Sequence, residues 1–252
     1  MIEIFFLSLI QGITEFLPIS SSSHLYLFSN YIDFTNQSLS IDVSLHIGSF
    51  IAVIIYFYKD LIDITKNKIL LLKILLSSFP VILSGAVLVK LNLINYLRNI
   101  EVIAWTTIVF GVLLYISDNF KLKKKIKEHF DYKSVLFIGF FQILSLIPGV
   151  SRSGISITAA RFLKFKRLDA AKISFLISIP TLGAVSLYGF YNLISSQDIS
   201  FSLLNLSSII LSFFFSYATI KYFLKYIQKF SLRIFVLYRI FLGLILLLIV
   251  YL

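Results

Sequence analysis

The chain has no cysteine and few charged residues, and both shortages limit what kind of protein it can be. Of its 252 residues, 14% are charged and 58% are hydrophobic, whereas soluble domains have about 25% and about 45–50%. Because a water-soluble fold could not bury so much apolar surface, we expect an integral membrane protein. Without cysteine, disulfides and thiolate ligands or nucleophiles are excluded, so any catalysis must use serine, threonine, histidine or carboxylate side chains.

The N-terminus lacks the basic region that begins a cleavable signal peptide. Residues 1–6 contain no lysine or arginine. The polar stretch at 11–15 follows too early for an apolar signal core and a cleavage site. We therefore expect this segment to be retained.

Six apolar runs are long enough to cross a bilayer as helices, because a hydrocarbon core of about 30 Å selects about 20 apolar residues. They lie at 41–58, 74–91, 102–118, 173–192, 203–224 and 234–252. Two further apolar segments, 2–28 and 134–163, are interrupted by proline, glycine and serine. Opened backbone persists at membrane depth only where protein or water satisfies it, so we predict that each is a re-entrant helical hairpin.

The cations predict the orientation. The net charge is +11, and 19 of the 23 lysines and arginines lie in four segments, 59–73, 119–133, 161–172 and 221–233. Basic loops favour the cytoplasmic side, which puts the loops near 29–40, 92–101 and 192–202 outside. We read the basic segments as loops near anionic headgroups and expect no nucleic-acid partner.

The two hairpins are predicted to enter from opposite sides, as in an inverted-topology repeat. Gln11 precedes the first break much as Gln142 precedes the second, and Ser78-Phe79-Pro80 is similar to Ser178-Ile179-Pro180. The first repeat would cover 1–120 and the second 134–252, joined by the basic loop 121–133. The expected fold is an all-α polytopic membrane protein whose hairpin tips meet near mid-membrane.

Ionisable groups inside apolar segments are candidates for function because they are costly there. Glu15 and Arg152 lie on opposite hairpins, so the repeat would bring a carboxylate and a guanidinium into one cavity. The alternative is a purely structural ion pair. His46 and Arg239 we assign to packing or to support of the site.

Ser151, Arg152 and Ser153 form the second break and have the chemistry of an oxyanion cradle. A guanidinium binds phosphate oxygens bidentately, hydroxyls flank it, and an open turn offers N–H groups at a helix start. The alternative is a hydroxyl-rich helix cap. The arginine between the serines favours the cradle.

The first break offers oxygen ligands and a possible nucleophile. Gln11 and Glu15 share one helical face, and four serines and a histidine follow. Such oxygens suit Mg²⁺ or Ca²⁺. The alternative is that the same groups form a catalytic pair, in which a serine is the nucleophile and His24 or Glu15 is its base.

The segment from Gln11 to His24 resembles the first signature of the undecaprenyl-diphosphatases, also called bacitracin-resistance proteins, and the segment from Pro148 to Ser153 resembles the second. Similarity continues at 45–49, 175–180 and 238–243. The resemblance implies an integral membrane phosphatase that hydrolyses undecaprenyl diphosphate to the monophosphate and phosphate. This step recycles the lipid carrier of peptidoglycan precursors.

The resemblance also implies residue roles. Glu15 with Gln11 would bind a divalent cation, Mg²⁺ or Ca²⁺, or act in acid–base catalysis, and Ser21 or His24 would be the nucleophile. The phosphate-binding residues would be Ser20, Ser22, Ser151, Arg152 and Ser153. Gln11 replaces a glutamate common in the family, which leaves Glu15 as the main anion.

The expected setting is the bacterial inner (plasma) membrane, with a multi-pass chain whose site faces outward. Partners would be the lipid substrate and the bilayer, with a homodimer left open. A polyprenyl-phosphate transporter or flippase is the alternative function, since inverted repeats with broken helices are typical of transporters. A transporter, however, does not need a serine beside a base.

Overall fold

The computed structural model describes residues 1–31, 38–91, 93, 97, 99–120, 124–195 and 203–252. Within these ranges the chain is helical apart from turns and one isolated bridge between Lys124 and Phe165. The first half contains α1 (Ile2–Thr14), α2 (Ser21–Tyr31), α3 (Leu39–Tyr56), α4 (Tyr58–Lys66), α5 (Lys68–Lys90) and α7 (Ile100–Asp118). The second half contains α8 (Ile126–His129), α9 (Tyr132–Ile143), the 3-10 turn Leu144–Leu146, α10 (Arg152–Phe162), α11 (Arg167–Ser195), α12 (Leu203–Lys229) and α13 (Arg233–Tyr251).

Six of these helices have the length and hydropathy to cross a membrane, so the six predicted spans are confirmed. They are α3, α5, α7, α11 up to Asn192, α12 and α13. Two helices begin earlier than predicted, α5 at Lys68 and α11 at Arg167. Hydropathy detects only the apolar part of a helix, and these helices continue into their basic flanks. The predicted loop at 161–172 is therefore reduced to 163–166 between α10 and α11.

The surface and the interior have the polarity expected of a protein in lipid. Phe241, Leu244 and Leu248 of α13 are exposed. By contrast, α3 and α12 pack through a buried polar contact, in which the Ser49 hydroxyl lies 3.1 Å from that of Ser212 and 2.9 Å from that of Ser216. Apolar side chains face outward and small polar ones inward, so the molecule is a multi-pass membrane protein.

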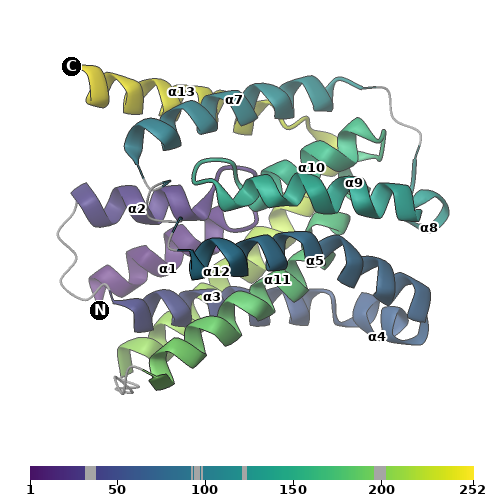
Figure 1. Cartoon of the computed structure of the whole chain (residues 1–252), viewed down its shortest axis with the longest axis horizontal. Coiled ribbons are helices and arrows are strands. Elements are labelled where there is room, and N and C mark those ends of the chain that lie inside the picture. The colour runs from purple at the N-terminus through teal and green to yellow at the C-terminus, as the bar shows by residue number, and fades with distance from the viewer. Residues whose placement is uncertain (32–37, 92, 94–96, 98, 121–123, 196–202) are drawn as a thin grey trace.

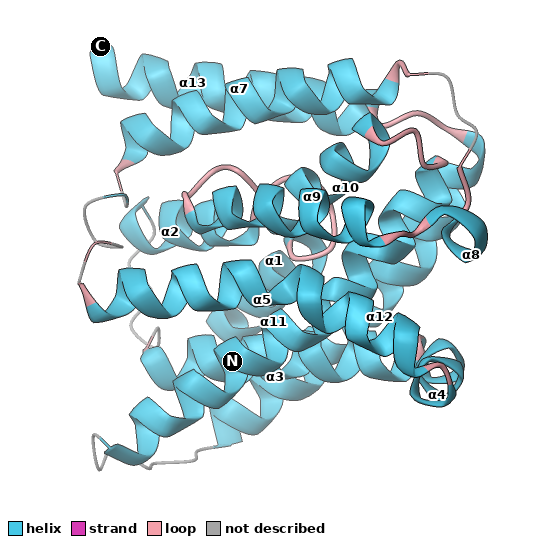
Figure 2. Cartoon of the chain, turned by 45° about the vertical axis from the view of Figure 1, so that its right-hand side comes forward, coloured by secondary structure: helices cyan, strands magenta, loops and turns pink. Residues whose placement is uncertain are grey.

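The two broken segments are pairs of short helices placed inside the arrangement of long ones (Figure 2). In the first, α1 packs against α12 and leads into α2; in the second, α9 packs against α5, and α10 packs against α7 and α11. The candidate site residues lie in the breaks between the paired helices, at 15–20 and 147–151, or in the helix turns next to them.

The basic segments lie at one end of the molecule. In Figure 1, α4 and α8 lie at the right-hand end, while both chain termini lie at the left-hand end. About half of the residues in the predicted cation-poor loops at 29–40, 92–101 and 192–202 lie outside the described residues.

Candidate active site

The first break places a carboxylate and a serine in direct contact. Glu15 follows the last residue of α1, and α2 begins at Ser21. The Ser21 hydroxyl donates to Glu15 Oε2 at 2.6 Å, and the Gln11 amide donates to the same oxygen at 3.1 Å. Ser20 has a φ of 75°, which turns the chain back so that Ser21 faces Glu15.

The second break brings the arginine to the other oxygen of the same carboxylate. Ser151, with a φ of 70°, caps α10 by accepting from the Gly154 N–H at 3.1 Å. Arg152 is the first residue of α10, and its Nη2 donates to Glu15 Oε1 at 2.7 Å. The expected approach of Glu15 and Arg152 is therefore present, and the pair is nearly buried, with side-chain exposures of 6% and 15%.

Two buried polar atoms at this cluster have no partner among the described residues. They are Nη1 of Arg152, a donor, and Oε1 of Gln11, an acceptor. Buried polar groups are normally hydrogen-bonded. The open donor is therefore suited to an anionic oxygen of a ligand, and the open acceptor to a donor or a cation.

Arg239 holds the two breaks together, in line with its predicted assignment to packing or to support of the site. Its Nη1 donates to the carbonyl of Pro18 at 3.2 Å in the first break and of Val150 at 3.1 Å in the second. Its Nη2 donates to Gly149 O at 2.8 Å, and its Nε to Thr107 O at 3.1 Å. The carbonyls opened by the breaks are thus satisfied by one fully buried guanidinium.

The serines predicted to bind phosphate have different surroundings. Ser153 donates to Leu17 O at 2.7 Å and so links the second break to the first, and its hydroxyl lies 3.1 Å from that of Ser151. In the first break, the Ser20 hydroxyl lies 3.4 Å from that of Ser22, which is exposed. Ser151 caps α10 through the Gly154 N–H, as the alternative to the oxyanion cradle predicted, and it is also the neighbour of Arg152.

His24 is separated from the Glu15 cluster by its own partners. Its Nδ1 lies 2.6 Å from Ser20 O, and its Nε2 lies 2.5 Å from the Tyr238 hydroxyl. The carbonyl accepts only, so Nδ1 donates and Nε2 accepts from the tyrosine. Tyr238 begins the 238–243 segment of family similarity, but no pattern in the sequence predicted its contact with His24. His46, assigned to packing or to support of the site, interacts electrostatically with Glu15.

The arrangement combines the parts that phosphoryl transfer needs. A hydroxyl donates to a carboxylate, which an arginine orients from the other side, as in an activated nucleophile with its base and orienting group. Charged groups removed from water interact more strongly than they do in water. In the described part of the chain, no group of three or more histidine, aspartate or glutamate side chains comes together as a metal site.

Comparison with known proteins identifies the family. A family profile described as Bacitracin resistance protein BacA matches residues 4–245. A protein of Pelagibacter ubique (strain HTCC1062) named undecaprenyl-diphosphatase is 49% identical over 251 residues, covering 99% of this chain and 98% of that protein. Proteins of the same name from Jannaschia sp. (strain CCS1) and Aliivibrio salmonicida (strain LFI1238) are 37% and 41% identical, covering 98% and 96% of this chain and 98% and 95% of their own lengths. The chain belongs to the bacitracin resistance protein BacA family.

Proposed function

We propose that the protein hydrolyses undecaprenyl diphosphate to undecaprenyl phosphate and inorganic phosphate, which recycles the lipid carrier for cell-wall synthesis. The observation that carries the proposal is the 2.6 Å hydrogen bond from Ser21 to Glu15, with Arg152 on the other carboxylate oxygen at 2.7 Å. Relatives named undecaprenyl-diphosphatase, similar over nearly the whole chain, support it. A transporter binds and releases phosphate intact and has no use for a hydroxyl held against a base.

In the first step, Ser21 is the nucleophile and Glu15 its base. The free Nη1 of Arg152 binds an oxygen of the terminal phosphate, while Glu15 accepts the Ser21 proton. The serine oxygen forms a bond to the terminal phosphorus as the bond from that phosphorus to the bridging oxygen breaks. The bridging oxygen leaves with undecaprenyl phosphate.

Before the second step, Glu15 releases to solvent the proton that it took from Ser21. Water then attacks the phosphoserine phosphorus, and the ionised Glu15 accepts a proton from that water. The bond from phosphorus to the Ser21 oxygen breaks, the serine regains its proton and phosphate leaves. Assignment of the nucleophile to Ser21 over His24 is supported by the partners of the histidine, both of whose ring nitrogens are engaged. His24 instead holds the turn at Ser20 in place.

A divalent cation, Mg²⁺ or Ca²⁺, fits the donor set as a partner of the substrate. The buried and unpartnered Oε1 of Gln11, together with Glu15, would hold it, with diphosphate oxygens and water as the other ligands. When bound, the cation would neutralise charge that develops on the phosphate.

The architecture we propose is an inverted-topology repeat of 1–120 and 134–252, each with one re-entrant hairpin. Helix packing supports it: α1 packs against α12 and α9 against α5, and α3 packs against α12 and α11 against α5. In an inverted repeat, α1 would correspond to α9, α3 to α11 and α5 to α12. Under this correspondence the α1–α12 contact matches the α9–α5 contact, and the α3–α12 contact matches the α11–α5 contact. Both breaks also turn at a serine of positive φ, Ser20 at 75° and Ser151 at 70°.

The orientation we propose puts the basic end in the cytoplasm and the site open to the outer face of the bacterial inner (plasma) membrane. The positive-inside tendency supports this, because α4 and α8 with their basic flanks lie at the same end (Figure 1). The diphosphate headgroup would then be reached from outside while its tail stays in the bilayer.

The test is phosphate release by the purified protein from undecaprenyl diphosphate in detergent with Mg²⁺ or Ca²⁺. We expect Glu15→Gln and Arg152→Ala each to reduce the rate by about 100-fold or more, as the loss of a general base or of an anion-stabilising group does. Thermal unfolding would show that both variants are folded. Rates near that of the parent in both variants would contradict the assignment. Transfer of intact lipid between leaflets without phosphate release would favour the flippase.

A further inference from the structure

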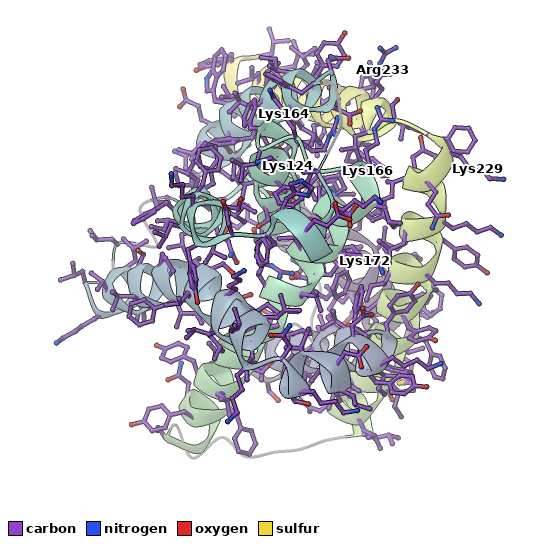
Figure 3. The ribbon with its side chains drawn as sticks, turned by 90° about the vertical axis from the view of Figure 1, so that its right-hand side faces the viewer. Lys124, Lys164, Lys166, Lys172, Lys229 and Arg233 are labelled. Carbon is purple, nitrogen blue, oxygen red and sulfur yellow. The ribbon has the colours of Figure 1, made fainter. Side chains whose placement is uncertain are left out.

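Six cationic side chains gather at the basic end of the molecule, away from the candidate active site. Figure 3 looks onto this end and shows them on one face. They come from the segment before α8, the link between α10 and α11, helix α11, and the ends of α12 and α13 that meet here. This set, called the cationic patch below, comprises Lys124, Lys164, Lys166, Lys172, Lys229 and Arg233.

The main chain brings three of these lysines together from distant parts of the sequence. The N–H of Lys124 donates to Lys164 O at 3.1 Å, and the N–H of Lys166 donates to Lys124 O at 3.1 Å. Lys164 has a φ of 70°, a conformation in which glycine is usual after a helix end. The backbone thus holds the three lysines close to one another, although their like charges repel.

The carboxylates near the patch are already used beneath it. Asp118 accepts from Arg167 at 2.7 and 3.0 Å and lies 3.3 Å from Nε of the fully buried Arg161. It also accepts from the Leu232 N–H at 3.1 Å, while Asp169 accepts from the Ile126 N–H at 3.3 Å. Between described residues, no ion pair joins a cation of the patch to a carboxylate. Asp131 attracts Lys124 electrostatically but accepts from the Ser134 N–H at 2.8 Å, so the charge of the patch is not neutralised by an ion pair within this part of the chain.

The patch lies at the boundary between apolar surface and water. The Arg233 guanidinium lies 6.0 Å from the centre of the Tyr115 ring, and Lys124 Nζ lies 6.0 Å from the centre of the Phe165 ring. Phe120, where α7 has just ended, is exposed, and its ring packs on Phe162 at 5.7 Å. Phe165 is buried, whereas Tyr115 is exposed, and an exposed aromatic ring beside a cation is typical of headgroup depth in a membrane. An anionic ligand at this depth has the chemistry of a phospholipid headgroup.

We propose that the cationic patch binds the phosphate of an anionic phospholipid, with Lys124, Lys164 and Lys166 as the residues that contact it. Two features support a site over general attraction to the membrane. The backbone pairing fixes the lysines together, and the neighbouring carboxylates are occupied. The site is separate from the Glu15 cluster and does not depend on the proposed hydrolysis.

The test uses a fluorescent reporter next to the patch. Trp105 is the only tryptophan, so Trp105→Phe with Phe120→Trp puts a single indole two residues beyond the end of α7. There the ring at position 120 packs on Phe162, the last residue of α10 and two residues before Lys164. This protein would be reconstituted in phosphatidylcholine bilayers containing brominated phosphatidylglycerol or brominated phosphatidylcholine. Quenching at low ionic strength then gives the relative binding constant of the anionic lipid.

We expect Lys164→Gln with Lys166→Gln to lower that constant by about fivefold for each lysine removed, since a lysine near an anionic surface contributes about 1 kcal/mol. The matched control is Lys66→Gln with Lys68→Gln, which removes two exposed lysines at the same end of the molecule and should leave the constant unchanged. Equal losses in both pairs would mean general electrostatics and would overturn the proposal, as would no loss in either. Displacement of the lipid by inorganic phosphate at equal concentration would also overturn it, because the ligand would then be free phosphate.

Discussion

Glu15 is the residue on which the site depends, because its two oxygens have different partners. Oε2 accepts from Ser21 at 2.6 Å and Oε1 from Arg152 at 2.7 Å. The carboxylate therefore connects a hydroxyl of its own break to a cation of the other. Removing either charge leaves the other nearly buried and uncompensated, which destabilises a protein strongly. A variant that leaves the ion pair intact is therefore needed beside Glu15→Gln and Arg152→Ala, because it separates a loss of catalysis from a loss of stability.

Ser21→Ala is such a variant, because it removes the hydroxyl and keeps both charges. We expect phosphate release to fall by about 100-fold or more, since the nucleophile is lost. Ser207→Ala is the matched control, because Ser207 has no predicted role at the site and its hydroxyl donates to the Leu203 carbonyl of the same helix, α12, at 2.8 Å. The control should keep a rate near that of the parent. A phosphorylated intermediate that persists in Ser21→Ala would move the covalent role to another residue, with His24 next.

Arg239→Lys tests the residue that joins the breaks. The guanidinium donates to four carbonyls, including Pro18 O at 3.2 Å and Gly149 O at 2.8 Å. A lysine cannot reach all of them, and each buried acceptor left without a donor costs about 1–3 kcal/mol. We expect a free energy of unfolding lower by at least about 2 kcal/mol, and a lower kcat with a smaller change in KM. The control is Arg233→Lys at an exposed position, which should change neither the free energy of unfolding nor kcat. If Arg239→Lys also left both quantities unchanged, the breaks would hold together without this arginine.

At the scale of elements, each break is a short turn that opens the backbone and passes the freed carbonyls to side chains. Thr106 donates to Pro148 O at 2.6 Å and Ser153 to Leu17 O at 2.7 Å, in addition to the bonds from Arg239. Hydrogen bonds of this kind to the freed carbonyls are what allow irregular backbone at membrane depth.

The predicted similarity of 78–80 to 178–180 does not fit the proposed repeat. It would make α5 correspond to α11, whereas the helix packing makes α5 correspond to α12. Helices α5 and α11 pack on each other, and Ser78 donates to Ile177 O at 2.8 Å.

The second break requires glycine at position 149. Gly149 has a φ of 90°, and a Cβ there would lie against the Thr106 hydroxyl and 2.7 Å from Ile103 O. We expect Gly149→Ala to lower the free energy of unfolding by about 1–3 kcal/mol through backbone strain and to reduce activity by moving Arg152. Thermal unfolding and phosphate release would be measured together.

Gly85→Ala is the control for that variant. Gly85 lies within α5, and a Cβ there would meet only Leu146 at 3.4 Å. Alanine in a helix interior is favoured over glycine by about 1 kcal/mol, so this variant should be as stable as the parent or more stable. Equal losses in the two variants would contradict the special role of the second break.

At the scale of the whole molecule, charge is distributed unevenly along the long axis. The segments around α4 and α8 and the cationic patch lie at one end, opposite both chain termini (Figures 1 and 3). The asymmetry follows the tendency of basic segments to stay in the cytoplasm. The proposed orientation can be tested by labelling single introduced cysteines, because the chain has no cysteine of its own that would react.

Single cysteines at opposite ends test this orientation. Ser195 ends α11 and Lys66 ends α4, and both are exposed. A membrane-impermeant maleimide applied to intact cells or spheroplasts should label Ser195→Cys, and should label Lys66→Cys only after the membrane is permeabilised. The reverse pattern would invert the orientation and open the site to the cytoplasm.

The sequence by itself determined the six spans and which kinds of side chain are available to the candidate site. A span depends on the hydropathy of about 20 consecutive residues, and Glu15, Ser21 and Arg152 stand out as polar groups in apolar segments. Helix starts in basic flanks, such as those of α5 and α11, were missed, because charged residues there hide the helix from a hydropathy reading.

Only the tertiary structure decided which polar group meets which. The bond from Arg152 to Glu15 joins residues 137 apart in the chain, and that from Arg239 to Pro18 joins residues 221 apart. His24 meets Tyr238 rather than Glu15, which no local pattern indicates. Hydropathy and turn chemistry depend on neighbours in sequence, whereas these contacts depend on how helices pack, and that is settled only when the whole chain is folded.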